Sequence, residues 1–174
     1  MADRKCTAAD LEAITSVTSS ASNSDSCDEV YPNVFLSSRR IAKDRESLKK
    51  LGITHVFNAA QGPEPQYVDT DAEYYENDGI KFQGLPGEED GPGYQLCQHF
   101  EKTADFMQEA LDSGGKVLVH CIMGRSRSPT LVLAYLMKKH GMTAEEALKT
   151  VKENRDICPN AGFLQQLCDL NEKL

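Results

Sequence analysis

The chain lacks the features that would mark it as a membrane, secreted or nucleic-acid-binding protein. No run of apolar residues approaches the roughly 20 that a helix needs to cross a bilayer. Residues 1–5 have no apolar segment behind them, so we do not expect a secretion signal. Basic residues number only 19 against 27 acidic ones, and a net charge of −8 disfavours general binding to nucleic acids. We therefore expect neither a membrane nor a nucleic-acid partner.

The cysteines also lack a recognisable pattern. Six of them stand at positions 6, 27, 97, 121, 158 and 168, with no C-x-x-C pair and no zinc-site spacing, so we expect no metal. Without a secretion signal, we interpret all six as reduced thiols of a cytoplasmic or nuclear protein. Oxidation could join one of them to Cys121 in a regulatory disulfide, and the sequence does not indicate which one.

The composition is that of an ordinary globular protein, with 40% hydrophobic and 26% charged residues over 174 positions. Segments typical of strands alternate with segments typical of helices, which predicts an α/β fold with a central, mostly parallel twisted sheet flanked by helices. The expected strands are a pair within 30–36 that turns at Pro32-Asn33, then 53–58, 80–82 and 117–119. The expected helices are 39–51, 71–77, 96–111, 129–140, 143–154 and one from about 160.

Residues 1–27 differ in composition from the rest, being rich in Ser, Thr, Ala and Asp. Apolar residues at 11, 14 and 17 favour a short helix, and 19–26 has the composition of a flexible link. A wholly disordered tail is the alternative. We predict a flexible arm with a short helix over 1–27 and one globular domain over 28–174.

The most informative segment is His120–Ser128. The apolar strand Val117–Val119 precedes it and the helical pattern of Pro129–Met137 follows, so a tight loop must connect a strand to a helix. Ser128 is a favourable N-cap and Pro129 a favourable first helical residue. The unpaired N–H groups and the dipole at a helix start bind anions, phosphate above all. The sequence therefore predicts a phosphate site at the carboxyl end of this strand.

Two side chains of this loop supply reactive chemistry. A helix N-terminus and nearby cations lower the pKa of a cysteine from about 8.5 to roughly 3.5–7.5, so we expect Cys121 to be a nucleophilic thiolate. The planar guanidinium of Arg127 can hold two phosphate oxygens and the charge that develops on them. Gly124 permits a backbone angle that a side chain would block. The hydroxyl of Ser128 could donate a hydrogen bond to the sulfur, and His120 could orient the cysteine backbone.

Each of these residues also has a purely structural interpretation. Most free cysteines are buried small hydrophobic residues, and an arginine often forms only a surface salt bridge. The co-occurrence of Cys121, Gly124, Arg127 and a helix start makes the chemical interpretation the stronger one.

The pattern His-Cys-x-x-Gly-x-x-Arg-Ser resembles the signature of cysteine-based protein phosphatases. Two further segments, 51–60 and 154–164, extend the resemblance to small, atypical dual-specificity phosphatases related to the vaccinia virus enzyme, from about Asp28 to Leu174. The resemblance implies the cysteine-dependent phosphatase fold and a catalytic domain over 28–174. It also implies a cysteinyl-phosphate intermediate, no cofactor, and an N-terminal helix docked near the substrate. The implied phosphate-binding residues are Ile122, Met123, Gly124, Arg125, Ser126 and Arg127.

The resemblance further implies a general acid, an aspartate on a mobile loop roughly thirty residues before the cysteine. Three acids, Glu88, Glu89 and Asp90, lie in the Gly- and Pro-rich segment 84–94. Asp90 falls at the position of the family aspartate, and Glu89 is the alternative. The segment is longer than in the family, and a solvated acidic loop is the structural interpretation.

Arg155 is implied by the resemblance to line the rim of the site, where it would meet a second phosphate or an acidic side chain. An ion pair that stabilises the end of its helix is an equally good interpretation.

These observations leave three functions open. The first is a phosphatase for phosphotyrosine and phosphoserine or phosphothreonine in a protein substrate, which the intact Cys121 and Arg127 and a short chain with a shallow pocket favour. The second is a pseudophosphatase that only binds phosphoproteins. The third is a phosphatase for lipids, sugars or RNA ends. Phosphatases that act on lipids usually carry extra lysines in the loop, whereas this loop has only Arg125 besides Arg127.

Overall fold

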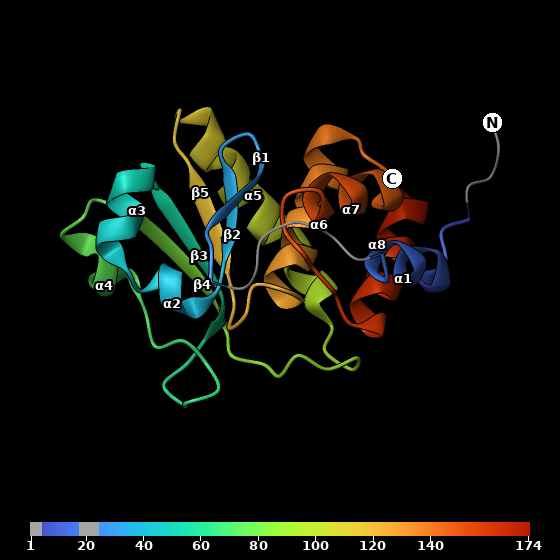
Figure 1. Ribbon diagram of the computed structural model, residues 1–174, viewed down its shortest axis with the longest axis horizontal. Coiled ribbons are helices and arrows are strands. Elements are labelled where there is room, and N and C mark those ends of the chain that lie inside the picture. Colours follow the sequence, from blue (N-terminus) through green and yellow to red (C-terminus); the bar gives the residue numbers. More distant parts are fainter. Residues whose placement is uncertain (1–4, 18–24) are drawn as a thin grey trace.

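The computed structural model describes residues 5–17 and 25–174, and these form a five-stranded sheet with helices on both faces (Figure 1). The strands are β1 (Asp28–Tyr31), β2 (Val34–Ser37), β3 (His55–Gln61), β4 (Lys81–Pro86) and β5 (Val117–His120), in the order β1-β2-β5-β3-β4. The β1–β2 hairpin is antiparallel and every other neighbouring pair is parallel. The predicted α/β fold with a mostly parallel sheet is confirmed.

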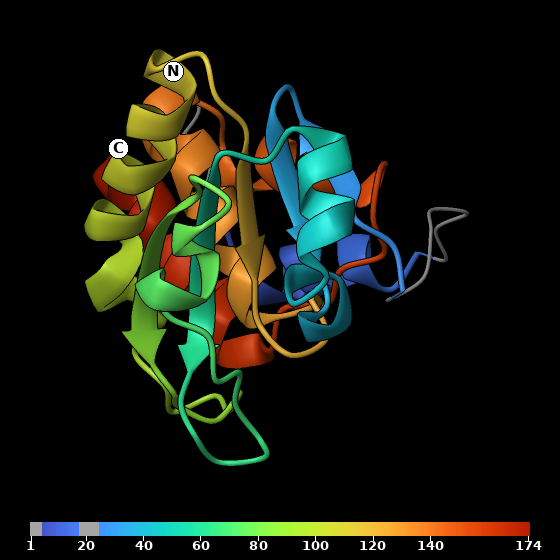
Figure 2. The same ribbon diagram turned by 90° about the vertical axis from the view of Figure 1, so that its left-hand side faces the viewer.

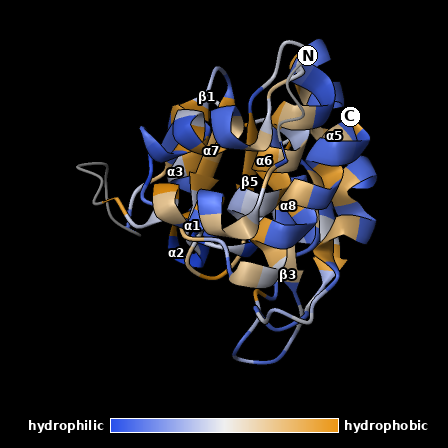
Figure 3. Ribbon diagram, turned by 90° about the vertical axis from the view of Figure 1, so that its right-hand side faces the viewer, coloured by the Kyte–Doolittle hydropathy of each residue, from blue (hydrophilic) through white to orange (hydrophobic). Residues whose placement is uncertain are grey.

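The helices form two layers. The bounds are α1 (Ala8–Thr15), α2 (Arg39–Ala42), α3 (Arg45–Leu51), α4 (Ala72–Glu76), the 3₁₀ helix η1 (Leu96–His99), α5 (Phe100–Asp112), α6 (Arg127–His140), α7 (Ala144–Lys152) and α8 (Ala161–Lys173). Helices α2 to α4 cover one face of the sheet, the side that faces the viewer in Figure 2. The remaining helices cover the other face, where the outer helices show hydrophilic residues toward solvent (Figure 3).

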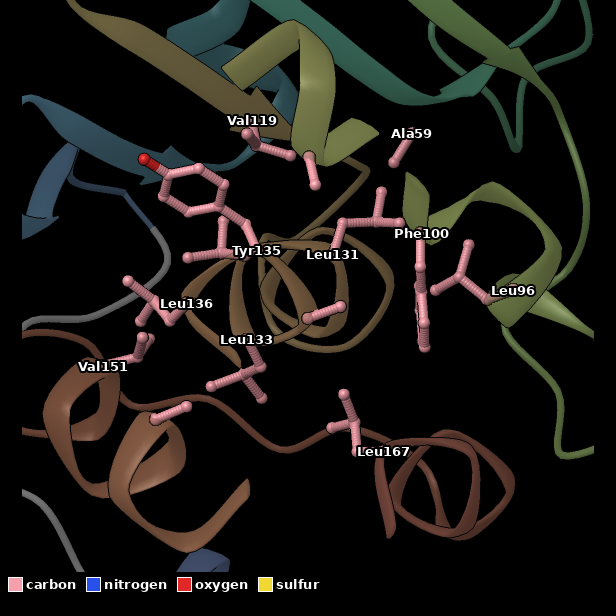
Figure 4. Packing of buried hydrophobic residues seen from close by; sticks show 14 of the residues in the cluster. Ala59, Leu96, Phe100, Val119, Leu131, Leu133, Tyr135, Leu136, Val151 and Leu167 are labelled. Carbon is pink, nitrogen blue, oxygen red and sulfur yellow. The ribbon is translucent and has the colours of Figure 1, made fainter. Parts of the chain in front are cut away.

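Helix α6 runs through the centre of the larger layer. Its residues from Arg127 to Met137 are all buried, because sheet, α5, α7 and α8 surround it. Figure 4 shows side chains of this helix packed between Val119 of β5, Phe100 of α5, Val151 of α7 and Leu167 of α8. Residues 131–137 of α6 are apolar on every side of the helix, and such a segment is stable only in a buried position. Its N-terminus, which the preceding loop joins to β5, is thereby held rigidly.

Three predicted helices differ in detail from the structure. The one expected over 39–51 is divided, because the Asp44 side chain accepts the Ser47 N–H and starts a second helix. The one expected over 96–111 begins as the 3₁₀ helix η1. The one expected from Pro129 with Ser128 as its cap begins instead at Arg127, with Ser126 at the N-cap position. The hydroxyl of Ser128 bonds to a sulfur atom rather than to the backbone, as described below.

The N-terminal helix is attached to the C-terminal one. Cys6 and Cys168 form a disulfide with Cα atoms 5.2 Å apart, and α1 packs on α7 and α8 with Leu11 fully buried. The expectation that all six cysteines are reduced is therefore wrong for this pair, which are 162 residues apart in the sequence. Cys27, Cys97, Cys121 and Cys158 are free. Most of the predicted flexible link over 19–26 lies outside the described residues.

Among the described residues, no helix combines the length and apolar character needed to span a membrane.

Candidate active site

The site is built on the loop between β5 and α6, residues 121–126, which we call the β5–α6 loop. Strand β5 lies in the middle of the sheet between β2 and β3, and the loop leaves its carboxyl end. Cys121 is the first loop residue and is 3% exposed. The Ser128 hydroxyl, in the first turn of α6, donates a hydrogen bond to its Sγ at 3.3 Å. The sulfur therefore lies on the floor of the loop with a donor directed at it.

The backbone carbonyls of this loop all have hydrogen-bond partners. The Ile122 carbonyl accepts a hydrogen bond from the Arg39 N–H (2.8 Å). The Met123 and Gly124 carbonyls accept from Nη2 (3.0 Å) and Nε (2.9 Å) of Arg155. The Arg125 and Ser126 carbonyls accept from the N–H groups of Cys158 (2.8 Å) and Thr130 (3.1 Å). Within the described part of the chain, the N–H groups of residues 122–126 have no such partner. Successive unpaired amides at a helix N-terminus form an anion site.

Gly124 makes this arrangement possible. Its φ is +69°, a region that other residues rarely adopt, and a Cβ at this position would overlap the backbone carbonyl of Ser37. The residue was expected to permit an unusual backbone angle, and the structure shows that angle.

Arg127 lines the same cavity as Cys121. The residue is 7% exposed and Nη1 donates to the Glu88 carbonyl at 2.7 Å, whereas Nε is buried without a partner among the described residues. A buried, unpaired guanidinium N–H is costly unless an anion accepts it. The cavity of about 430 Å³ beside Arg127 is lined by Asp90, Cys121, Ile122, Met123, Arg125, Ser126, Arg127 and Cys158.

Of the three candidate acids, Asp90 lines this cavity and Glu88 and Glu89 do not. Its Oδ1 accepts hydrogen bonds from Ser126 Oγ at 2.8 Å and from Asn160 Nδ2 at 2.7 Å. The long loop that carries Asp90 is thus closed onto the β5–α6 loop.

Asn160 was expected only to begin the last helix. It does cap α8, with Oδ1 accepting the Phe163 N–H, and it also donates to Asp90 and, through its own N–H, to Ser126 Oγ at 3.1 Å. The segment 154–164 resembles the phosphatase family, but nothing in the sequence indicates that Asn160 meets an acid 70 residues earlier.

Arg155 does not lie where the resemblance placed it. The side chain is 1% exposed and every hydrogen bond that it makes is to the protein interior, so it cannot meet a second phosphate at the rim. An ion pair of 2.7 Å joins it to Asp28 at the start of β1. Arg125 is the arginine whose side chain reaches the rim, where it is half-exposed and lies 3.5 Å from Asp156.

His120 supports the loop from within the sheet. Its ring is fully buried and Nδ1 lies 3.1 Å from the Cys121 carbonyl, so Nδ1 must carry the proton. Burial lowers the pKa of His120 from its ordinary value of 6.5 to about 4. The neutral ring holds the cysteine backbone, as expected for this residue.

The buried His120 predicts a pH-dependent stability. The unfolded chain takes up a proton near pH 6.5 and the folded chain only near pH 4, so the free energy of unfolding falls as the pH is lowered between these values. The protonation of His120 alone should lower the free energy of unfolding by about 2 kcal/mol between pH 7 and pH 5. Urea unfolding of the wild type and of His120→Gln at both pH values measures this difference. An equal loss in the two proteins would show that His120 is not responsible.

The described residues hold no group of three or more His, Cys, Asp or Glu side chains placed to bind a metal ion.

Known proteins resemble the chain over almost its whole described length. Residues 34–173 match the family model of the "Dual specificity phosphatase, catalytic domain". Dual specificity protein phosphatase 26 of Homo sapiens is 47% identical over 148 residues, which cover 84% of this chain and 68% of that protein. The crystal structure of human DUSP28 has a TM-score of 0.73 at 33% identity and covers 90% of this chain and 98% of its own. That of DUSP15 has a TM-score of 0.72 at 30% identity, with 83% and 86% covered.

Proposed function

Because the chain belongs to the dual-specificity protein phosphatases, we propose that it hydrolyses phosphoproteins through a covalent intermediate on Cys121. As a member of this family, the chain is a protein phosphatase that acts on phosphotyrosine and on phosphoserine or phosphothreonine. The roles of individual residues, given next, are our proposal.

In the first step the Cys121 thiolate attacks the phosphorus atom of the bound phosphoryl group. The S–P bond forms as the bond to the ester oxygen breaks, and the departing oxygen takes a proton from Asp90. The amides of residues 122–126 and the guanidinium of Arg127 bind the three remaining oxygens, whose charge changes during transfer. Closure of the Asp90 loop brings the acid to the mouth of the same cavity.

In the second step water attacks the cysteinyl phosphate. Asp90, now a carboxylate, accepts a proton from the water, inorganic phosphate forms and the S–P bond breaks. The electrons of that bond return to sulfur, and the Ser128 hydroxyl at 3.3 Å stabilises the thiolate as it leaves.

One observation carries this proposal: every carbonyl of residues 122–126 accepts a hydrogen bond, while their N–H groups, beside a buried cysteine and a buried arginine, have no partner among residues 5–17 and 25–174. The arrangement is complementary to a tetrahedral oxyanion within reach of a nucleophile.

Phosphate release from three substrates tests the proposal: a phosphotyrosyl peptide, a phosphothreonyl peptide and p-nitrophenyl phosphate. We expect turnover of all three. Binding of the peptides without any release of phosphate would contradict catalysis and identify a phosphoprotein-binding module.

The leaving group should reveal the general acid. Asp90→Asn cannot donate a proton, so turnover of a poor leaving group such as phenyl phosphate should fall by about 10²–10⁴-fold, while that of a good one such as p-nitrophenyl phosphate should fall much less. Glu89→Gln is the matched variant, and we expect it to keep nearly wild-type rates on both. The reverse pattern would assign the acid to Glu89.

The partner and the location also belong to this proposal. We propose a phosphorylated protein as substrate and a cytoplasmic or nuclear location. The free thiol that catalysis requires at Cys121 supports this location, whereas the Cys6–Cys168 disulfide is a bond more usual in secreted proteins. Fractionation of cells that produce the tagged chain measures the location, and recovery from the secreted fraction would contradict it.

A further inference from the structure

One side chain holds the underside of the β5–α6 loop. The Nε of Arg155 donates to the Gly124 carbonyl at 2.9 Å and its Nη2 donates to the Met123 carbonyl at 3.0 Å. The same guanidinium reaches the start of β1, where Nη1 donates to the carbonyl of Ser26, just before the strand, at 3.0 Å and to Oδ2 of Asp28, its first residue, at 2.7 Å. It therefore connects three segments that are far apart in the sequence.

The geometry of the peptide bond makes these two contacts consequential. In a trans peptide the C=O of one residue and the N–H of the next point in opposite directions, and no cis peptide occurs in the described chain. Holding the Met123 carbonyl on the protein side directs the Gly124 N–H the other way, and holding the Gly124 carbonyl does the same for the Arg125 N–H. These two amides are among those proposed to bind phosphate.

The charge of Arg155 is balanced beneath the loop. An uncompensated guanidinium that is 1% exposed would be strongly destabilising, and the Asp28 carboxylate, 13% exposed, supplies the opposite charge. Gly124 admits this close approach, since a Cβ there would come too near Arg155 Nη2 as well as the Ser37 carbonyl.

We propose that Arg155 is a positioning residue for the phosphate site: its planar fork orients the Gly124 and Arg125 amides toward the substrate, and Asp28 holds the fork in place. The proposal rests on the proposed phosphatase function and replaces the role at the rim that the family resemblance implied.

Arg155→Lys is the direct test, because an ammonium cannot occupy both carbonyl positions in one plane. We expect kcat/KM for p-nitrophenyl phosphate to fall by roughly 10²-fold, as when an oxyanion donor is lost. The inhibition constant of tungstate, a tetrahedral oxyanion, should rise by about tenfold. Asp28→Asn keeps an acceptor for Nη1 and should change both values less.

If Arg155 only stabilised the fold, replacing it would affect tungstate binding no more than replacing another buried residue of similar importance for stability. Leu48→Ala, in the layer of α3, is the matched control, because it lowers the stability of a buried position remote from the loop. Assayed well below its melting temperature, it should bind tungstate like the wild type. The proposal is overturned if Arg155→Lys binds tungstate within twofold of wild type, or if Leu48→Ala weakens binding equally.

The binding measurement also separates this proposal from the function on which it rests. Calorimetric titration with tungstate reports the orientation of the amides without any turnover. Hydrolysis by the wild type with unchanged tungstate affinity in Arg155→Lys would refute the positioning role alone. Absence of hydrolysis in the wild type would refute the phosphatase mechanism, and weakened tungstate binding by Arg155→Lys would still support the positioning role.

Discussion

Replacing Cys121 with serine is expected to abolish phosphate release, with a loss of turnover of at least about 10⁴-fold. A serine hydroxyl remains protonated at neutral pH and is a weak nucleophile unless a base lies beside it. The imidazole of His120 is fully buried, its Nδ1 donates to the Cys121 carbonyl, and its Nε2, the nitrogen that could accept a proton, has no hydrogen-bond partner among the described residues, so it does not serve as that base. Initial rates on p-nitrophenyl phosphate and on a phosphotyrosyl peptide measure the effect.

Two controls make this result specific. Cys97→Ser changes an exposed free cysteine outside the cavity and should retain the wild-type rate. Cys121→Ser should still bind the phosphotyrosyl peptide, since the amides and Arg127 remain. Substantial turnover by Cys121→Ser would show that another group is the nucleophile.

Arg127→Lys is the second change from which we expect a large loss, about 10²–10⁴-fold in kcat/KM. The side chain is nearly buried, its Nη1 donates to the Glu88 carbonyl and its Nε has no partner in the described part of the chain, so it is oriented before substrate arrives. Each hydrogen bond between charged partners contributes about 1.5–3 kcal/mol, and lysine cannot form the planar pair.

The matched control for this change is Arg45→Lys, an arginine of α3 whose ion pair with Asp78 lies in the other helix layer. It should leave kcat/KM within about twofold of wild type. Equal effects of the two substitutions, or an Arg127→Lys enzyme with wild-type kcat/KM, would contradict the role of Arg127.

The sequence was informative where the chemistry is local. Nine residues contain Cys121, Gly124, Arg127 and the start of the helix. The conformation of so short a loop depends mainly on the spacing of its own residues, so it could be predicted. The sheet was predictable as well, because alternating strands and helices leave few topologies open. The start of α6 was misplaced by two residues because Ser128, a good cap by type, bonds to the Cys121 sulfur instead.

The remaining features depend on contacts between distant parts of the chain. Arg155 meets Asp28 and Gly124 only after β1, the loop and the end of α7 have come together, so its burial could not be predicted from its neighbours. The contact of Asn160 with Asp90 and the disulfide between Cys6 and Cys168 have the same origin. No periodicity or spacing encodes such pairs.

The central claim, that the Cys121 sulfur becomes covalently phosphorylated, has a direct measurement. The enzyme is mixed with p-nitrophenyl phosphate and quenched in denaturing detergent during turnover. It is then digested, and the masses of its peptides are measured by mass spectrometry. We predict a phosphoryl group, about 80 Da, on the peptide that contains Cys121, and more of it in Asp90→Asn, which lacks the base for the second step. Full turnover with no phosphoryl group on Cys121, or with the group on another residue, would contradict the account.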